Sequence, residues 1–238
     1  MRQRQNVSLL MKKEVVVAVR SCRYQILLSL TFPALMQWVL MQKLLGVTSK
    51  MGASAALIPK EMAVTLLLMY LAPILIPFLA NPLLSKSIIE ERASGGLMVT
   101  LTSGINTGFL WAVKTLGVFI FCYCIYCVFL LVDVIAIVYF LKLGASLSWF
   151  TLVSVVFISP LCALSITVLM SCMNWAFRSA AMISSFLPLV LGMWLITLNY
   201  KQLSLLRQVS AATVAACIVL LICGLIVSKV SRARIVGL

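Results

Sequence analysis

The chain has 238 residues, of which 63% are hydrophobic and only 10% are charged, and its formal net charge is +14. Soluble domains contain about 45–50% apolar residues, so this composition excludes a soluble globular protein and indicates an integral membrane protein. The basic residues lie mostly at the ends of apolar runs, which is typical of membrane topology and of contact with anionic lipids rather than of nucleic-acid binding.

Residues 1–24 predict a short cytosolic tail followed by an amphipathic helix. One helical face carries the apolar side chains of Met11, Val15, Ala18, Val19 and Cys22. The basic side chains that fall away from this face are those of Lys12, Lys13, Arg20 and Arg23. A helix with this pattern lies in the membrane interface, with its basic groups near the lipid headgroups.

The apolar runs that follow are each long enough to cross a hydrocarbon layer of ~30 Å as an α-helix. They lack the alternation of apolar and polar residues that marks an outer-membrane barrel strand. Pro73 and Pro77 lie one turn apart in the second run and should bend it. We expect six transmembrane helices, at about residues 25–45, 62–84, 114–141, 148–173, 180–199 and 209–229. The predicted fold is therefore an all-α integral membrane protein, with a six-span domain at 25–229 and a basic tail at 230–238.

The distribution of positive charge predicts how the spans are oriented. With the N-terminus in the cytoplasm, most of the 19 Lys and Arg residues fall on the cytosolic side. By the positive-inside rule, both termini should then be cytosolic. The same orientation places two links in the cytoplasm: the segment 85–113 between the second and third spans, and the short link Asn174–Ser179 between the fourth and fifth.

The segment 85–113 carries a tight charged group followed by a glycine pair and a spaced apolar row. In chain order it holds Glu90, Glu91, Arg92, Gly95, Gly96, Leu97, Leu101 and Ile105, and Lys114 follows at the start of the third predicted span. The segment is longer than the ~2–8 residues of a simple helix connection. The apolar spacing of i, i+4 and i+8 predicts a short helix that could insert one face into a groove on a partner. The alternative is a solvated loop whose interfacial helix only anchors it.

This segment resembles the cytosolic loop of the type-2 ABC exporter permeases. In that family an acidic residue, a glycine, spaced leucines and a lysine that opens the third span follow one another in the order seen from Glu90 to Lys114. The match departs from the family pattern at Gly96, where Thr is usual, and at Gly104, where Pro is usual. The resemblance covers essentially the whole chain, from the interface helix to the basic C-terminal end.

The resemblance implies a membrane permease subunit of an ATP-driven exporter. Its partners would be a cytosolic ABC ATPase subunit and a second permease subunit, of the same or a related chain. The site residues that would couple this chain to the ATPase are Glu90, Glu91, Arg92, Gly95, Gly96, Leu97, Leu101 and Lys114. The substrate would be a peptide, a lipid or a hydrophobic small molecule moved out of the cytoplasm. The location would be a bacterial plasma membrane.

The chemistry that the chain lacks also narrows its function. It contains no histidine, which excludes Ser–His and Cys–His nucleophile pairs and histidine-based metal sites. It has no G-x-x-x-x-G-K-[ST] loop for nucleotide phosphates. We therefore expect no catalytic residues, no metal site and no enzyme activity in this chain, with ATP and Mg bound by the partner ATPase.

Asp133 is the only aspartate in the chain, and it lies inside the third predicted span. Placing an aspartate at the centre of a membrane helix costs ~2.5–3.5 kcal/mol on insertion scales. One interpretation places Asp133 in the translocation path, in contact with a substrate or cation. The other is a structural carboxylate that is hydrogen-bonded to neighbouring Ser, Thr or Tyr or reached by Lys142.

Two other classes of function remain open. One is a non-transporting membrane assembly or immunity factor that uses the same fold to bind a partner. The other is a channel, or a carrier of ions or drugs. Carriers and channels normally show several ionisable residues buried in their spans, whereas Asp133 is the clear case in this sequence.

Overall fold

The computed structural model describes residues 60–90, 106–141, 149–176 and 205–229, together with Val16, Arg20, Tyr24, Leu27 and Thr31. The four continuous stretches are helical apart from Asn106, which directly precedes a helix. The first predicted span, 25–45, is described only at Leu27 and Thr31. The fifth predicted span, 180–199, and the tail, 230–238, lie outside the described residues.

The described helices are α2 (Lys60–Ser85), α5 (Thr107–Leu141), α6 (Trp149–Val153), α7 (Ser159–Ala176) and α9 (Leu205–Lys229). Two π-helical turns extend or join them: η1 (Lys86–Glu90) continues α2, and η3 (Ser154–Ile158) joins α6 to α7. The second, third, fourth and sixth predicted spans thus each coincide with a described helix or helical rod.

Among the described residues, three helical stretches are long and apolar enough to cross a membrane. They are Leu71–Ile88, Gly108–Tyr139 and Ser154–Trp175, and α9 adds a shorter apolar stretch, Thr213–Val227. This confirms the prediction of helices that fit a membrane protein for the described part of the chain. The total of six spans stays a prediction.

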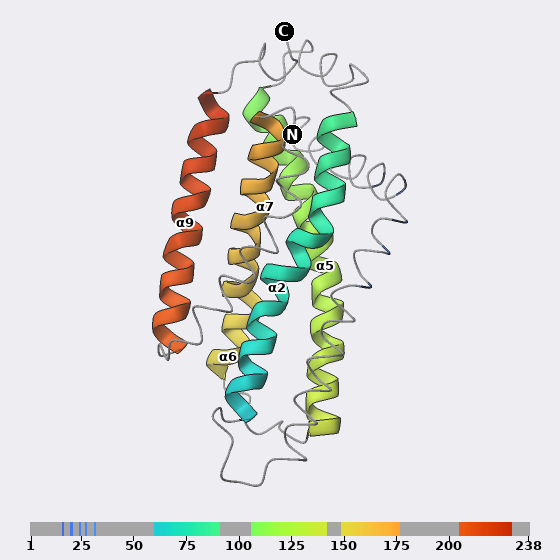
Figure 1. The fold of residues 1–238 in the computed structure, drawn as a ribbon, viewed down its shortest axis with the longest axis vertical. Helices are drawn as coiled ribbons and strands as arrows, with labels where there is room; N and C mark the ends of the chain where they lie inside the picture. The colour runs from blue at the N-terminus through green and yellow to red at the C-terminus, as the bar shows by residue number, and fades with distance from the viewer. Residues whose placement is uncertain are drawn as a thin grey trace, which may run out of the picture.

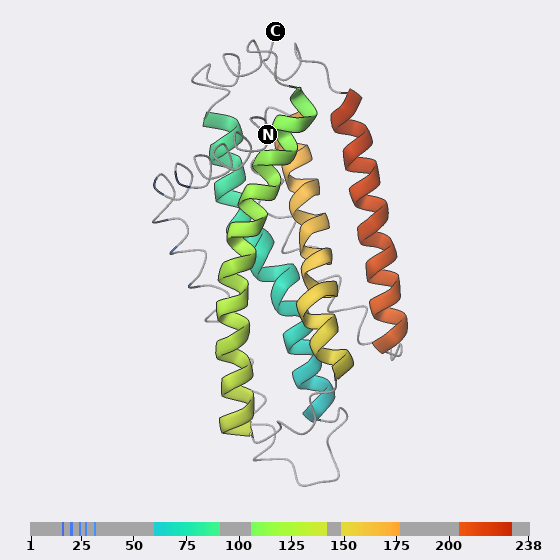
Figure 2. The same cartoon turned by 180° about the vertical axis from the view of Figure 1, so that it is seen from behind.

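The helices α2, α7 and α9 run in one direction and α5 runs in the other (Figures 1 and 2). α2 crosses α5, α7 packs against both of them, and α9 lies on the outer side of α7 (Figure 1). As a result, the last residues of α7 and α9 and the first residues of α5 lie at the same end of the bundle as η1. These are the helix ends that the charge distribution predicts to be cytosolic.

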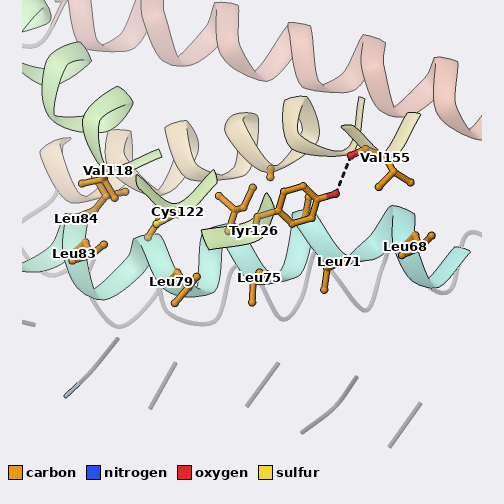
Figure 3. Close-up of a cluster of buried hydrophobic side chains, with 14 of the residues drawn as sticks. Leu68, Leu71, Leu75, Leu79, Leu83, Leu84, Val118, Cys122, Tyr126 and Val155 are labelled. Atoms are coloured by element: carbon orange, nitrogen blue, oxygen red, sulfur yellow. Dashed lines mark hydrogen bonds between the residues drawn. The ribbon is translucent and has the colours of Figure 1, made fainter. Parts of the chain in front are cut away.

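The core of the bundle forms where α2 meets α5 and α7. Along α2 the buried face carries Leu68, Leu71, Leu75 and Leu79, at spacings of three or four residues that keep them on one side of the helix (Figure 3). From α5, Val118, Cys122 and Tyr126 pack into the same cluster. Because lipid tails are as apolar as leucine, such contacts stabilise a membrane bundle through close packing rather than through removal from water.

α2 contains Pro73, Pro77 and Pro82, and its ribbon changes direction along its length (Figure 1). A proline has no N–H, so the carbonyl four residues earlier loses its helical hydrogen bond. For Pro73 that carbonyl belongs to Met69. The hydroxyl of Ser159, at the start of α7, donates a hydrogen bond to the Met69 carbonyl at 2.5 Å. A side chain of one helix thus replaces the hydrogen bond that proline removed from another.

The same replacement occurs at η3, where Pro160 follows the π-helical turn. Pro160 leaves the Val156 carbonyl without its α-helical donor, and the hydroxyl of Tyr123 donates to that carbonyl at 3.2 Å. The Ser159 N–H donates to the Ser154 carbonyl, so the Val155 carbonyl also lacks a helical donor.

The hydroxyl of Tyr126 donates to the Val155 carbonyl at 2.9 Å (Figure 3). We call the three contacts Ser159–Met69, Tyr123–Val156 and Tyr126–Val155 the mid-bundle clamp. In lipid, each unsatisfied backbone group costs roughly several kcal/mol. The three hydroxyls therefore lower the free-energy cost of the helix breaks at Pro73 and Pro160.

Candidate functional site

Of the site residues predicted from the sequence, the structure describes the backbone of Glu90 and the side chains of Lys114 and Asp133. Glu90 is the last residue of the π-helical turn η1. The remaining members of the predicted coupling segment lie outside the described residues, namely Glu91, Arg92, Gly95, Gly96, Leu97 and Leu101. Their role therefore stays a prediction, and the geometry of the site is that of the helix ends on either side of them.

The resemblance predicts that Lys114 opens the third span, but the structure places it inside α5. α5 begins at Thr107, about two turns before Lys114, because Asn106 caps the helix: its side-chain oxygen accepts a hydrogen bond from the Gly108 N–H at 2.9 Å. The Lys114 side chain is only 1% exposed. Its ammonium group donates to the hydroxyl of Ser87 at 3.2 Å. Lys114 thus ties the first part of α5 to η1 at the end of α2.

The next residue along α5 makes a second link, to α7. The Thr115 hydroxyl donates to the Trp111 carbonyl at 2.8 Å and lies 2.6 Å from the hydroxyl of Ser171. Since the one hydroxyl hydrogen of Thr115 is used for the Trp111 carbonyl, Ser171 is the donor in the contact between the two hydroxyls. Both side chains are buried.

A third link joins α7 back to α2. The side-chain amide of Asn174 donates to the hydroxyl of Ser85 at 3.5 Å, and Ser85 donates to the side-chain oxygen of Asn81 at 3.5 Å. These distances are long for hydrogen bonds, so each contact is weak by itself. Asn174 is 1% exposed. We call the whole set the polar seam: Asn81, Ser85, Ser87, Lys114, Thr115, Ser171 and Asn174.

The polar seam lies at the bundle end next to the predicted coupling segment, 85–113. The structure places the two ends of that segment in η1 and α5, and residues 91–105, which connect them, lie outside the described residues. The predicted second cytosolic link begins at Asn174, which belongs to the seam. The seam therefore links the described helix ends that lie next to the two segments predicted to be cytosolic.

Asp133 lies in the other half of α5 and is 7% exposed. By helical rise it is about 28 Å from Lys114 and about 10 Å beyond Tyr126. The structure thus does not bring the two predicted charged site residues together. The burial of Asp133 within the bundle is compatible with both interpretations of this residue. Its place in a translocation path stays a prediction.

Sequence reasoning missed most of the polar seam. Serine and threonine are common in membrane helices, and each can bond to a carbonyl of its own helix, as Thr167 does to Ala163 at 2.8 Å. Nothing in the order of residues distinguishes Thr167 from Ser171, which reaches another helix. The one feature of the sequence that could have indicated the seam is position along the span. Ser85, Thr115 and Ser171 each lie near the predicted cytosolic end of a predicted span.

Within the described stretches, no group of three or more His, Cys, Asp or Glu side chains could hold a metal ion. The described cysteines are all free thiols. Comparison of the chain with models of known families, with curated proteins and with solved structures finds no match. What the chain does must therefore be inferred from its residues and their geometry.

Proposed function

We propose that this chain is the membrane-spanning permease subunit of an ATP-driven ABC exporter. It moves a peptide, a lipid or a hydrophobic small molecule out of the cytoplasm. It works with cytosolic ABC ATPase subunits that bind ATP and Mg, and with a second permease subunit of the same or a related chain. The observation that supports this proposal best is the polar seam, because it attaches the helices on both sides of the predicted coupling segment to a third helix.

A permease without its own ATPase must receive motion from outside the membrane. A push on the segment 91–105 displaces the chain at η1 and at the start of α5. If these two ends were held by lipid contacts alone, the push would be lost in local bending. The contacts of Lys114 with Ser87 and of Thr115 with Ser171 hold them against α2 and α7. The displacement then moves spans rather than a loop.

In this mechanism, ATP binding closes the ATPase subunits against each other and moves the coupling segment. Glu90, Glu91 and Arg92 contribute charged contacts to the partner, and the apolar row of Leu97 and Leu101 contributes the face that inserts into it. Surface ion pairs are worth only ~0–1 kcal/mol each, so the rigid segment rather than any single pair carries the force. The spans then open a path to the outside at the interface of the two permease subunits, with Asp133 along that path.

One observation favours a second candidate, an ion or drug carrier. Lys114 is buried in α5, so the described helices hold two buried charged residues, Lys114 and Asp133, rather than the one expected from the sequence. Buried ionisable groups are characteristic of proton and ion pathways. A carrier would act without an ATPase partner, which gives the two candidates different outcomes in the same experiment.

The test is purification of the tagged chain from its own cells in a gentle detergent, with mass spectrometry of the proteins that stay bound. We expect a stoichiometric partner that contains a phosphate-loop ATPase. A matched preparation of a variant lacking Gly95 and Gly96 should retain less of that partner while reaching the membrane at the same level. Recovery of the chain alone, or with partners that are not ATPases, would contradict the exporter and favour the carrier or the assembly factor.

A further inference from the structure

The polar seam forms a closed ring of contacts among three helix ends. Ser87 of η1, which continues α2, meets Lys114 of α5; Thr115 of α5 meets Ser171 of α7. Asn174 of α7 closes the ring at Ser85 of α2. Each pair of helices is linked once, so no helix end can move away from the other two without breaking a contact on each side.

This arrangement differs from the usual behaviour of hydroxyl groups in the same helix. In α7, Ser165 donates to the Cys162 carbonyl and Thr167 to the Ala163 carbonyl, both within the helix. Such bonds add nothing to the attachment between helices. Ser171, one turn beyond Thr167, instead meets α5, and Asn174 meets α2. The change coincides with the bundle end that carries the predicted coupling segment.

Four of the seven seam side chains are buried, which favours contacts that depend on one another. Lys114, Thr115, Ser171 and Asn174 are each at most 1% exposed. Water therefore does not replace a partner that is lost, and an unpaired polar group in such surroundings is strongly unfavourable. Once one contact opens, the helices separate locally and the remaining contacts of the ring lose their geometry.

We propose that the polar seam makes the ends of α2, α5 and α7 a single rigid body, which passes motion of the coupling segment to α7 as well as to its own flanking helices. Ser87, Thr115, Ser171 and Asn174 are positioning residues in this role, because they act through the helices that they hold. The transmission part of this inference rests on the proposed exporter function, whereas the rigid body itself does not.

The rigid body is tested on the purified full chain by hydrogen–deuterium exchange of peptides covering residues 107–114 and 171–176. Ser87→Ala and Ser171→Ala should each raise exchange about fivefold, the effect of losing one hydrogen bond. In the double variant, the rise should be clearly smaller than the product of the two single effects, because the first break already opens the ring.

Thr167→Val is the matched control, since its hydroxyl is equally buried but bonds only to its own helix. Combined with Ser87→Ala, it should give the simple product of the single effects. If Ser87→Ala and Ser171→Ala also multiply, their contacts are independent and the rigid body is disproved.

The transmission role is tested on the complex with its co-purified ATPase, with and without a non-hydrolysable ATP analogue. In the unaltered complex the nucleotide should change exchange in both peptides. In the Ser87→Ala/Ser171→Ala variant it should change exchange in 107–114 and leave 171–176 unchanged. A nucleotide response in both peptides of the variant would overturn the transmission role. If no ATPase co-purifies, the exporter proposal and the transmission role both fail, and the double-variant measurement still decides the rigid body.

Discussion

Single hydroxyl groups allow this bundle to contain prolines within helices that are long and apolar enough to cross a membrane. Pro73 and Pro160 each leave a carbonyl without a helical donor, and a residue of a neighbouring helix supplies the missing hydrogen. Ser159 serves the Met69 carbonyl, and Tyr123 serves the Val156 carbonyl. These two carbonyls are therefore satisfied across helices rather than along them, which turns the breaks at Pro73 and Pro160 into points of attachment.

Replacing Ser159 by Ala should destabilise the protein by about 1–3 kcal/mol, because the Met69 carbonyl is left without a donor. Pro73→Ala restores the backbone N–H at residue 73, so Ser159→Ala should cost much less in that background. The measurement is the free energy of unfolding in mixed detergent micelles, for the unaltered protein, the two single variants and the double variant. An equal cost of Ser159→Ala in both backgrounds would show that the hydroxyl does not replace the proline hydrogen bond.

Tyr126→Phe should also lower the free energy of unfolding by about 1–3 kcal/mol, since it removes the donor to the Val155 carbonyl and keeps the ring in place. Tyr139 lies on the same helix and is exposed, so Tyr139→Phe provides the comparison and should have little effect. The same micelle unfolding assay applies. If the two substitutions change the free energy of unfolding equally, the hydrogen bond from Tyr126 to the Val155 carbonyl does not stabilise the protein.

At the scale of helices, hydropathy located the described helices better than it located their ends. The predicted second span, 62–84, closely matches α2, but the helix continues through η1 to Glu90. The predicted third span starts at Lys114, whereas α5 starts at Thr107. The reason is that a run of apolar residues indicates only the part of a helix that fits in lipid. The first residue of the helix is determined by its cap.

The burial of Lys114 could not be predicted in the same way. Lysines beside apolar runs usually lie at the interface, and no pattern in the sequence indicates that Ser87, on another helix, meets this one. The coupling role of Lys114 was inferred from resemblance alone, and its contact with Ser87 became visible only in the structure. The glycine and leucine positions between the two helices remain predictions.

Asn106 should set the start of α5. Its side-chain oxygen accepts from the Gly108 N–H, and its carbonyl accepts from the Leu110 N–H at 3.0 Å. Asn106→Ala removes the side-chain cap and should cost about 0.5–2 kcal/mol, seen as faster hydrogen exchange in the first turn of α5. Asn106→Asp keeps an acceptor and should preserve the protection. Fraying in both variants would show that another contact fixes this helix end.

At the scale of the whole molecule, the bundle has two levels of polar attachment. The mid-bundle clamp links α2, α5 and the junction of η3 with α7 part-way along the bundle, and the polar seam links the three helices again at the end next to the predicted coupling segment. Leu71, Leu75 and Leu79 of α2 lie between the two levels. A bundle held at two heights transmits a displacement along its axis, as the proposed exporter requires.

Glu91→Ala, or deletion of Gly95 and Gly96, should therefore leave membrane insertion and the stability of the bundle unchanged and uncouple transport from ATP hydrolysis. The reason is that these residues belong to the predicted coupling segment and not to the polar seam or the mid-bundle clamp. Transport and hydrolysis are measured together in vesicles that contain the co-purified complex, with thermal unfolding as the check on folding. Unchanged transport per ATP in both variants would remove the coupling role from this segment.

The parallel course of α7 and α9 has a consequence for how the chain is assembled. α9 packs on α7 through Val168, Cys172, Cys223 and Val227, and it begins at the opposite end of the bundle from the end of α7 (Figure 1). During synthesis, α2, α5 and α7 leave the ribosome well before α9, and neither the mid-bundle clamp nor the polar seam needs α9. Val168 and Cys172 of α7 therefore gain their contacts with Cys223 and Val227 only after α9 has been synthesised. In the nascent chain, α9 packs onto a bundle in which α2, α5 and α7 have already been synthesised.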